Sequence, residues 1–162
     1  MDYLDLLKLL AASQPAEFIR TWQWAYPILE TIHVIGLGML FGGILAFDLR
    51  VLGLQPDIAI KPLARYLLPL VWLGFTLNAM SGALLFLSDA TKFGTNTSFL
   101  VKMSLICLAG LNMAWFHVRI FPGADTWSRS GKIPVAAKLS ALASIAMWIG
   151  VIAAGRMIAY VI

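Results

Sequence analysis

The chain has 162 residues, the length of one domain, and 60% of them are hydrophobic whereas only 12% are charged. A soluble globular domain carries about 25% charged residues, so this chain has too few charges to cover a water-facing surface. The net charge of +4 does not indicate a nucleic-acid-binding protein, because the basic residues stand in short segments beside hydrophobic stretches. We therefore predict an all-α integral membrane protein with almost no soluble domain.

The first 14 residues predict a short amphipathic helix that lies in the membrane interface. Asp2, Asp5 and Lys8 recur at three-residue steps, and leucines fill most positions between them. That pattern gives the helix one polar and one apolar face. A break follows at Pro15, and residues 15–162 form the predicted transmembrane domain.

Four stretches are long and apolar enough to cross a bilayer as helices, which takes about 20 residues each. They cover residues 24–47, 66–88, 98–121 and 135–162, and the expected architecture is a four-transmembrane-helix bundle. Small residues form stripes on two of these spans. Gly38 with Gly42, and Gly74 with Asn78 and Gly82, favour close helix packing. Such stripes also leave room for a flat ligand, but packing is the preferred interpretation.

The distribution of Lys and Arg predicts the orientation of the bundle, because cytoplasmic loops carry an excess of both. Seven of them flank the joints between spans one and two and between spans three and four, and five lie on the opposite side. We predict a bacterial inner-membrane protein whose two termini face the periplasm. The seven are Arg50, Lys61, Arg65, Arg119, Arg129, Lys132 and Lys138, and the five are Lys8, Arg20, Lys92, Lys102 and Arg156.

Four ionisable residues within the spans are candidates for a binding site. An ionisable side chain inside a membrane costs about 2.5–3.5 kcal/mol unless it is paired, bound to a ligand or near the interface. Glu30 and His33 lie on the first span, Lys102 on the third and Arg156 on the fourth. At a rise of ~1.5 Å per residue, all of them fall in the half nearer the periplasm. Glu30 balances one cation, which leaves one positive charge beside a neutral imidazole.

This combination is typical of a site for an anionic cofactor that a histidine holds, and haem b fits it. Its iron takes an imidazole nitrogen, here of His33, and its propionates take Lys or Arg near the membrane surface. Gly36 and Gly43 are predicted to open an apolar slot for the porphyrin. Met80 and Met157 lie in the same half as candidates for a second axial ligand, although packing is the usual role of a methionine.

An ion-pair network is an equally weighted alternative for these residues. Glu30, Lys102 and Arg156 would then tie three helices together, and His33 would hydrogen-bond a neighbour. Lys102 could also extend its long side chain to the interface.

Further polar residues lie at the cytoplasmic end of the spans. His117 is at the opposite depth from His33 and cannot share one iron with it. His117 could bind a second haem, but an interfacial histidine beside two aromatic residues is the preferred interpretation. Asp48 and Arg50 close the first span at this end, and we expect them to pair with each other or with Arg65.

Segments of three spans resemble known bacterial membrane proteins. ETIHVIGLGMLFGGILAFDLRVL is similar to a first helix with an early histidine and a later pair of glycines, and MSGALLFL resembles the second helix. SFLVKMSLICLAGLNMAWFH looks like a third helix with Lys near its start and His near its end. The membrane proteins that these segments resemble belong to two families, the HemJ-type haem-b protoporphyrinogen oxidases and the CopD-type copper-resistance membrane domains. A closer resemblance is to an uncharacterised family of small four-helix proteins. The resemblance implies a scaffold for haem b, with His33 as the haem-linked histidine and Lys102 as an essential lysine.

We therefore expect a haem-b-binding membrane protein with a redox or electron-transfer role, which exchanges electrons with quinone or with a membrane redox partner. His33 is the expected iron ligand, and Lys102 and Arg156 are the expected propionate partners. Glu30 would orient or pair with them. The alternatives are a copper or small-solute transport protein, in which Glu30, His33 and Asn78 line a path, and a non-catalytic subunit of a membrane complex. Enzymatic activity, catalytic residues and assembly into a homo-oligomer stay open.

Overall fold

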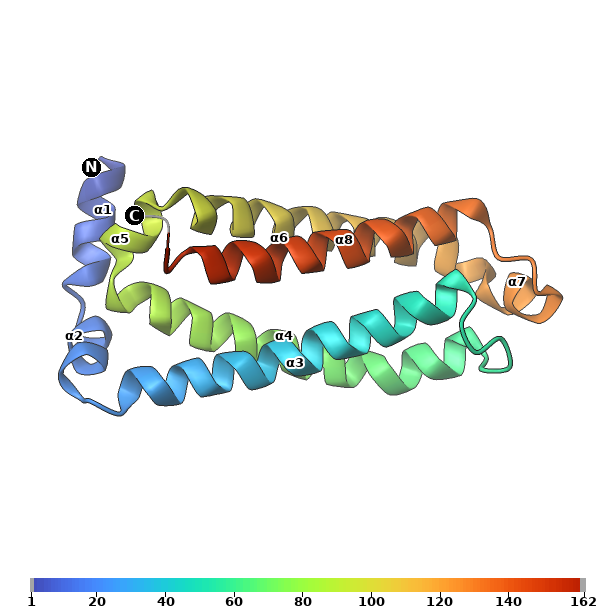
Figure 1. Ribbon diagram of the computed structural model, residues 1–162, viewed down its shortest axis with the longest axis horizontal. Helices are drawn as coiled ribbons and strands as arrows, with labels where there is room; N and C mark the ends of the chain where they lie inside the picture. The colour runs from blue at the N-terminus through green and yellow to red at the C-terminus, as the bar shows by residue number, and fades with distance from the viewer. Residues whose placement is uncertain (1, 161–162) are drawn as a thin grey trace.

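The structure is all-helical, as predicted (Figure 1). It is a computed structural model that describes residues 2–160, without the side chains of residues 129 and 130, and no strand occurs in that range. A π-helical turn (η1, Phe116–Ile120) and a 3₁₀ turn (η2, Phe121–Gly123) interrupt the α-helices. The α-helices are α1 (Tyr3–Ala11), α2 (Gln14–Thr21), α3 (Ala25–Leu52), α4 (Ile60–Ser88), α5 (Ala90–Thr95), α6 (Thr97–Trp115), α7 (Ala124–Ser130) and α8 (Val135–Met157).

Four helical segments are long and apolar enough to cross a membrane: α3, α4, the run Thr97–Ser128 that begins with α6, and α8. Three of them begin within one residue of the predicted starts. α4 begins at Ile60 rather than at residue 66, because Pro62 falls in its first turn, where a missing N–H breaks no helical hydrogen bond. α3 continues to Leu52, where Gly53 (φ 117°) ends it in the left-handed conformation that favours glycine. The last two residues of the predicted fourth span lie outside the described residues.

The four long helices form two pairs. α3 packs along α4, and α6 packs along α8. The pairs meet mainly through α3 and α8, whereas α4 and α6 make no extensive contact in the described part of the chain. Both chain termini lie at one end of the bundle, which we call the terminal end. The connection from α3 to α4 and helix α7 lie at the other end, which we call the loop end (Figure 1).

Two short helices precede the bundle and lie across its terminal end (Figure 1). α1 packs on α5, and α2 packs on α3 and α4. Leu7 of α1 is buried, and a Cβ atom on Gly94 of α5 would lie 2.7 Å from its methyl carbons. The Tyr3 hydroxyl donates to the Gly94 carbonyl at 3.0 Å. The predicted N-terminal helix therefore exists as α1, and the chain forms a further helix, α2, before α3 starts at Ala25.

α3 and α4 approach closely where glycines face the partner helix. A Cβ atom on Gly36 would lie 2.8 Å from the backbone nitrogen of Asn78. One on Gly74 would lie 2.6 Å from the backbone nitrogen of Leu40. Neither position can carry a side chain unless the helices separate. The stripe of Gly74, Asn78 and Gly82 therefore serves helix packing, as predicted.

Two predictions about other glycines are wrong. Gly36 and Gly43 open no slot for a porphyrin, because α4 covers both; a Cβ atom on Gly43 would lie 2.6 Å from a methyl carbon of Val71. Gly38 and Gly42 do not pack against another helix of the described chain, since a Cβ atom on either would meet no atom within 4 Å. Glycine spacing alone does not reveal which glycine faces a neighbour.

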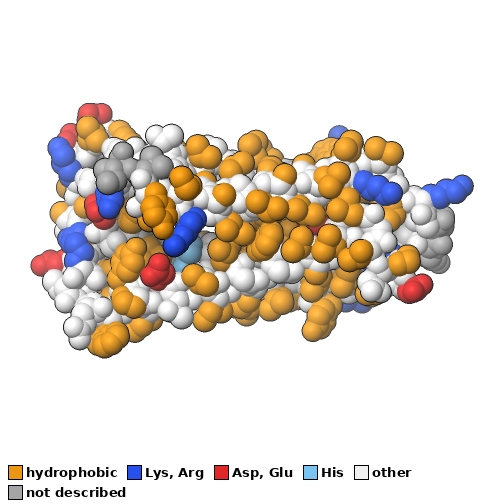
Figure 2. All heavy atoms as spheres, viewed as in Figure 1, with side chains coloured by type: hydrophobic (Ala, Val, Ile, Leu, Met, Phe, Trp, Pro, Cys, Tyr) orange, Lys and Arg blue, Asp and Glu red, His pale blue; other side chains and the backbone are white. Residues whose placement is uncertain are grey.

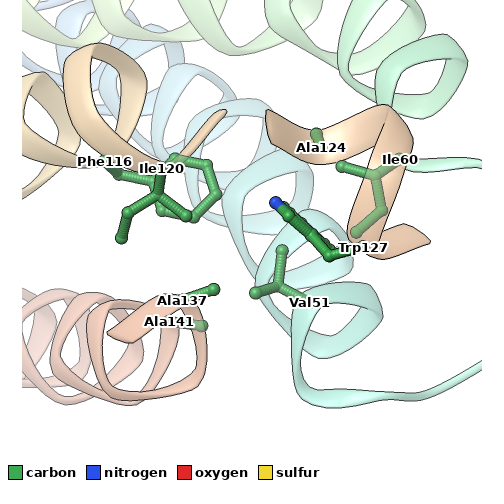
Figure 3. Packing of buried hydrophobic residues seen from close by; sticks show 8 residues of the cluster. All are labelled: Val51, Ile60, Phe116, Ile120, Ala124, Trp127, Ala137 and Ala141. Carbon is green, nitrogen blue, oxygen red and sulfur yellow. The ribbon is translucent and has the colours of Figure 1, made fainter. Parts of the chain in front are cut away.

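A cluster of buried apolar side chains closes the loop end of the bundle (Figure 3). Trp127 of α7 lies among residues from α3, α4 and α7 itself. The cluster ties both helix pairs together at this end. It consists of Val51, Ile60, Phe116, Ile120, Ala124, Trp127, Ala137 and Ala141.

Replacing Gly74 by alanine should destabilise the protein, because the added methyl group meets the backbone of α3 and forces the helices apart. We expect a loss of about 1–3 kcal/mol in the free energy of unfolding. Gly38→Ala is the matched control, because its methyl group enters open space and alanine favours a helix by about 1 kcal/mol over glycine. Thermal unfolding of the detergent-solubilised variants, followed by circular dichroism, measures the difference. A Gly74→Ala protein as stable as Gly38→Ala would contradict the close contact.

Candidate functional site

His33 of α3 is held by a buried serine of α4. Its ring Nδ1 lies 3.1 Å from the hydroxyl oxygen of Ser81, a residue that is only 2% exposed. The Ser81 hydroxyl donates to the Leu77 carbonyl at 2.6 Å, so it accepts the hydrogen bond from the imidazole. Nδ1 therefore carries the proton and Nε2 carries the lone pair. The described residues give Nε2 no hydrogen-bond partner.

Two more residues of α4 contact His33. The Asn78 side-chain amide donates to the His33 carbonyl at 2.9 Å. Gly82 lies against the ring, and a Cβ atom there would be 3.0 Å from Cε1 of the imidazole. The hydrogen bond to a neighbour that the ion-pair alternative expected for His33 is confirmed at Nδ1, but it leaves Nε2 available to a ligand.

Lys102 of α6 shares this terminal half of the bundle with His33. Its side chain is half-buried, and its Nζ would lie 3.6 Å from a Cβ atom on Gly155 of α8. Lys102 of one helix pair and His33 of the other therefore both lie in the terminal half of the bundle.

Glu30 and Arg156 lie at the same depth but form no ion-pair network. Both side chains are exposed, and Arg156 donates to the Tyr160 hydroxyl at 3.4 Å, with its guanidinium 5.7 Å from the centre of that ring. Among the described residues, neither residue makes an ion pair with a partner within 4.0 Å. The predicted network among Glu30, Lys102 and Arg156 is therefore wrong. Figure 2 shows a basic, an acidic and a histidine side chain near one another on an otherwise apolar face towards the terminal end.

The predicted second axial ligands, Met80 and Met157, find no support in the geometry. Met80 is 64% exposed and Met157 is 48% exposed, so both lie at the surface. Within residues 2–160, no three His, Cys, Asp or Glu side chains come together as a metal site would require. A metal ion bound to His33 would therefore need further ligands from a non-protein group, such as a porphyrin.

His117 lies in the π-helical turn η1, at the loop end. Its Nδ1 lies 3.0 Å from the Met113 carbonyl and donates to it. This ring too carries its proton on Nδ1 and its lone pair on Nε2. Of the two aromatic residues expected beside His117, Trp115 and Phe116, the Phe116 ring lies 5.7 Å from it, and the second aromatic neighbour is Phe121 at 5.2 Å. Single π-turns within α-helices are frequent at functional sites.

A cavity of about 240 Å³ lies between α3, α4, α6 and α8 on the loop side of the bundle centre. We call it the loop-end cavity. Most of its lining is apolar and includes the buried residues Leu40, Val71 and Trp148. Its polar lining residues are Asp48, Asn112, His117, Ser140 and Ser144.

Asp48 is the residue of this cavity whose role the sequence did not reveal. The expected pair with Arg50 or Arg65 is wrong, because Arg50 turns into the α3–α4 connection and donates to the carbonyls of Pro56 and Ile58. Asp48 is 7% exposed and hydrogen-bonds Ser144 of α8. Its Oδ2 atom is buried without any hydrogen-bond partner.

One sequence signal could have indicated this second polar site. Ser140 and Ser144 stand four residues apart on α8, so they share one helix face. Ser140 and Asn112 bond reciprocally: the Asn112 amide donates to the Ser140 carbonyl at 3.0 Å, and the Ser140 hydroxyl donates to the Asn112 side-chain oxygen at 2.9 Å. Such a face predicts polar partners on the neighbouring helices.

The fold and the sites define an all-helical bundle with four potential membrane spans and polar groups held between apolar helices. The chain belongs to the DUF6644 family, a family of unknown function, whose model matches residues 19–161. Searches of the curated proteins and of the solved structures find no match to the chain.

Both histidines should be found with the proton on Nδ1. Nitrogen chemical shifts of histidine-labelled protein distinguish the two neutral tautomers at mildly alkaline pH, and the chain contains only two histidines. Ser81→Ala should alter the signals of His33 alone, because His117 bonds a backbone carbonyl instead. A His33 that carries its proton on Nε2 would contradict the hydrogen bond to Ser81.

Proposed function

We propose that the chain is an integral protein of the bacterial inner membrane, with the loop end in the cytoplasm and both termini in the periplasm. Large apolar side chains cover the middle of the bundle, and most charged side chains lie towards its two ends (Figure 2). Soluble monomers rarely expose continuous apolar surfaces above about 600 Å². Residues of this surface that are more than half exposed include Val34, Ile35, Trp72, Leu73, Leu108, Leu111, Leu142 and Ile149.

The proposed activity is the binding of haem b through His33, in a redox role. The observation that supports it is the fixed imidazole: Ser81 accepts the Nδ1 proton, and Nε2 is left with its lone pair and no partner among the described residues. Metal-binding histidines in proteins almost always donate their other ring N–H in this way, which fixes the tautomer and the ring orientation. A bound haem would supply one-electron chemistry at this end of the bundle.

Lys102 supports an anionic ligand in particular. Its half-buried ammonium group has no ion-pair partner among the described residues, and an unpaired charge between apolar helices is unfavourable. A propionate group would balance it. Arg156, one residue after Gly155, lies at the same depth and is the second proposed propionate partner, while exposed Glu30 limits the net positive charge of the region.

The residues present fit haem in these respects, but α4 does not provide the porphyrin slot. His33 lies against Gly82 on the α4 side, so its free Nε2 would take a ligand from the side of α6 and α8, where the Lys102 side chain lies along Gly155. No observation favours the transport alternative, because the Asn78 amide bonds the His33 carbonyl and is not left to line a path.

Purified protein, expressed with ample haem, should show a Soret absorption band, and His33→Ala should abolish it because the iron loses its protein ligand. Ser81→Ala should weaken haem binding by about 10–100-fold, the usual effect of removing the residue that orients a metal-binding histidine. Titration of the apoprotein with haem, followed by absorbance, measures both effects.

Two variants serve as controls for this experiment. His117→Ala should retain the band, because His117 lies in the other half of the bundle. Lys102→Gln should weaken binding, and Lys102→Arg should largely restore it because the positive charge returns. A wild-type protein without a Soret band would refute the proposal, and a band that survives in His33→Ala would show that another residue holds the iron.

A further inference from the structure

The loop-end cavity is polar at one end and apolar at the other. On α3, Asp48 lies ~12 Å further along the helix axis than Leu40, and on α8 Ser140 lies ~12 Å from Trp148. The polar member of each pair is the one nearer the loop end. A ligand that fills this cavity therefore needs a polar head towards the cytoplasmic surface and an apolar body towards the centre of the bundle.

The cavity offers hydrogen-bond acceptors whose partners are missing. Asp48 Oδ2 is buried and unpartnered, and His117 presents a ring whose Nδ1 proton is already bonded to a carbonyl, which leaves Nε2 as an acceptor. No Lys or Arg of the described chain lines the cavity. Asn112 and Ser140 satisfy each other. Ionised Asp48 and His117 Nε2 both accept hydrogen bonds, so a ligand that pairs with them brings a hydrogen-bond donor.

The cavity is open towards the side of the bundle between α4 and α6. These two helices make no extensive contact in the described residues. Trp72 and Phe75 of α4 and Gly110 and Met113 of α6 line the cavity and are at the same time exposed. In a membrane, this opening faces lipid, so a ligand reaches Asp48 through the hydrocarbon layer rather than from water.

We propose that the loop-end cavity binds a membrane-soluble hydroquinone, whose ring hydroxyl donates to the Asp48 carboxylate and whose apolar tail leaves between α4 and α6. A neutral hydroxyl compound enters from lipid at little cost, whereas an organic cation must first be desolvated. The volume of about 240 Å³ suits one substituted ring, since a cavity of about 150 Å³ holds benzene.

This site deepens the proposed function, because a hydroquinone is a membrane-soluble electron donor. The role of that donor in electron transfer rests on the proposed haem, whereas the binding of the hydroquinone does not. Leu40 at the apolar end of the cavity lies ~10 Å along α3 from His33. The two sites are therefore separate but close.

Binding of decylubiquinol to the protein in lipid nanodiscs tests the site. Trp72 and Trp148 line the cavity, so tryptophan fluorescence reports occupancy. Asp48→Asn should weaken binding by about tenfold or more, the effect expected from loss of a hydrogen bond to a buried acceptor. In this variant the side-chain oxygen can keep the Ser144 bond while the amide N–H₂ faces the cavity. The variant should therefore bind the oxidised quinone at least as well as the wild type does.

Matched variants keep the test independent of folding and of haem. Gly110→Leu should fill the cavity opening and abolish binding, whereas Gly38→Leu should not, although a Cβ atom at both positions enters open space. Asp57→Asn, in the exposed α3–α4 connection, should bind like the wild type. His33→Ala should retain decylubiquinol binding even though it loses haem. Equal binding by wild type and Asp48→Asn, or Asp48-dependent binding of a lipophilic quaternary amine in place of decylubiquinol, would overturn the proposal.

Discussion

The arrangement of this protein depends on one constraint: a polar group between apolar helices must find a partner, because no water is there to replace it. Most of the inward-facing polar side chains meet this requirement within the bundle. Ser81 bonds His33 and a helix carbonyl, Asn78 bonds the His33 carbonyl, and Asn112 and Ser140 bond each other. The few acceptors that stay unpaired therefore indicate where a ligand belongs.

The two helix pairs explain why there are two such places. α3 and α4 are in close backbone contact through glycines, so little space remains between them. The loop-end cavity lies instead between the pairs, where α4 and α6 do not pack against each other in the described residues. Asp48 and His117 line it near the loop end, whereas His33 and Lys102 lie in the terminal half. His33 and Asp48 are ~22 Å apart along α3, so they cannot bind the same small ligand.

The helices and the depth of each residue could be predicted from the sequence, but the direction of each side chain could not. The four long helices follow from run length, and depth follows from the helical rise, so His33 and Lys102 were correctly placed in one half. Direction normally comes from an alternation of apolar and polar faces. Here lipid-facing and core positions are equally apolar, and that signal is absent. Glu30 and Arg156 therefore have the predicted depth without the predicted contacts, and Gly36 faces α4 instead of a cofactor.

Asp48 shows a second limit of the sequence. It stands two residues before Arg50 near the end of a span, where a pair at the membrane surface is the simplest expectation. Arg50 instead satisfies two carbonyls of the following connection. That connection bends back because Gly53 ends α3. Ser144 comes from α8, which packs along α3. Only the packed structure brings these segments together.

A crystal structure of the protein, extracted from its native membrane without added ligands, tests the central claim most directly. We expect non-protein density in bonding contact with His33 Nε2 and on the same side as Lys102, with the Ser81 hydrogen bond to Nδ1 intact. A structure in which Nε2 bonds a side chain of the protein, with no bound group between His33 and Lys102, would contradict it.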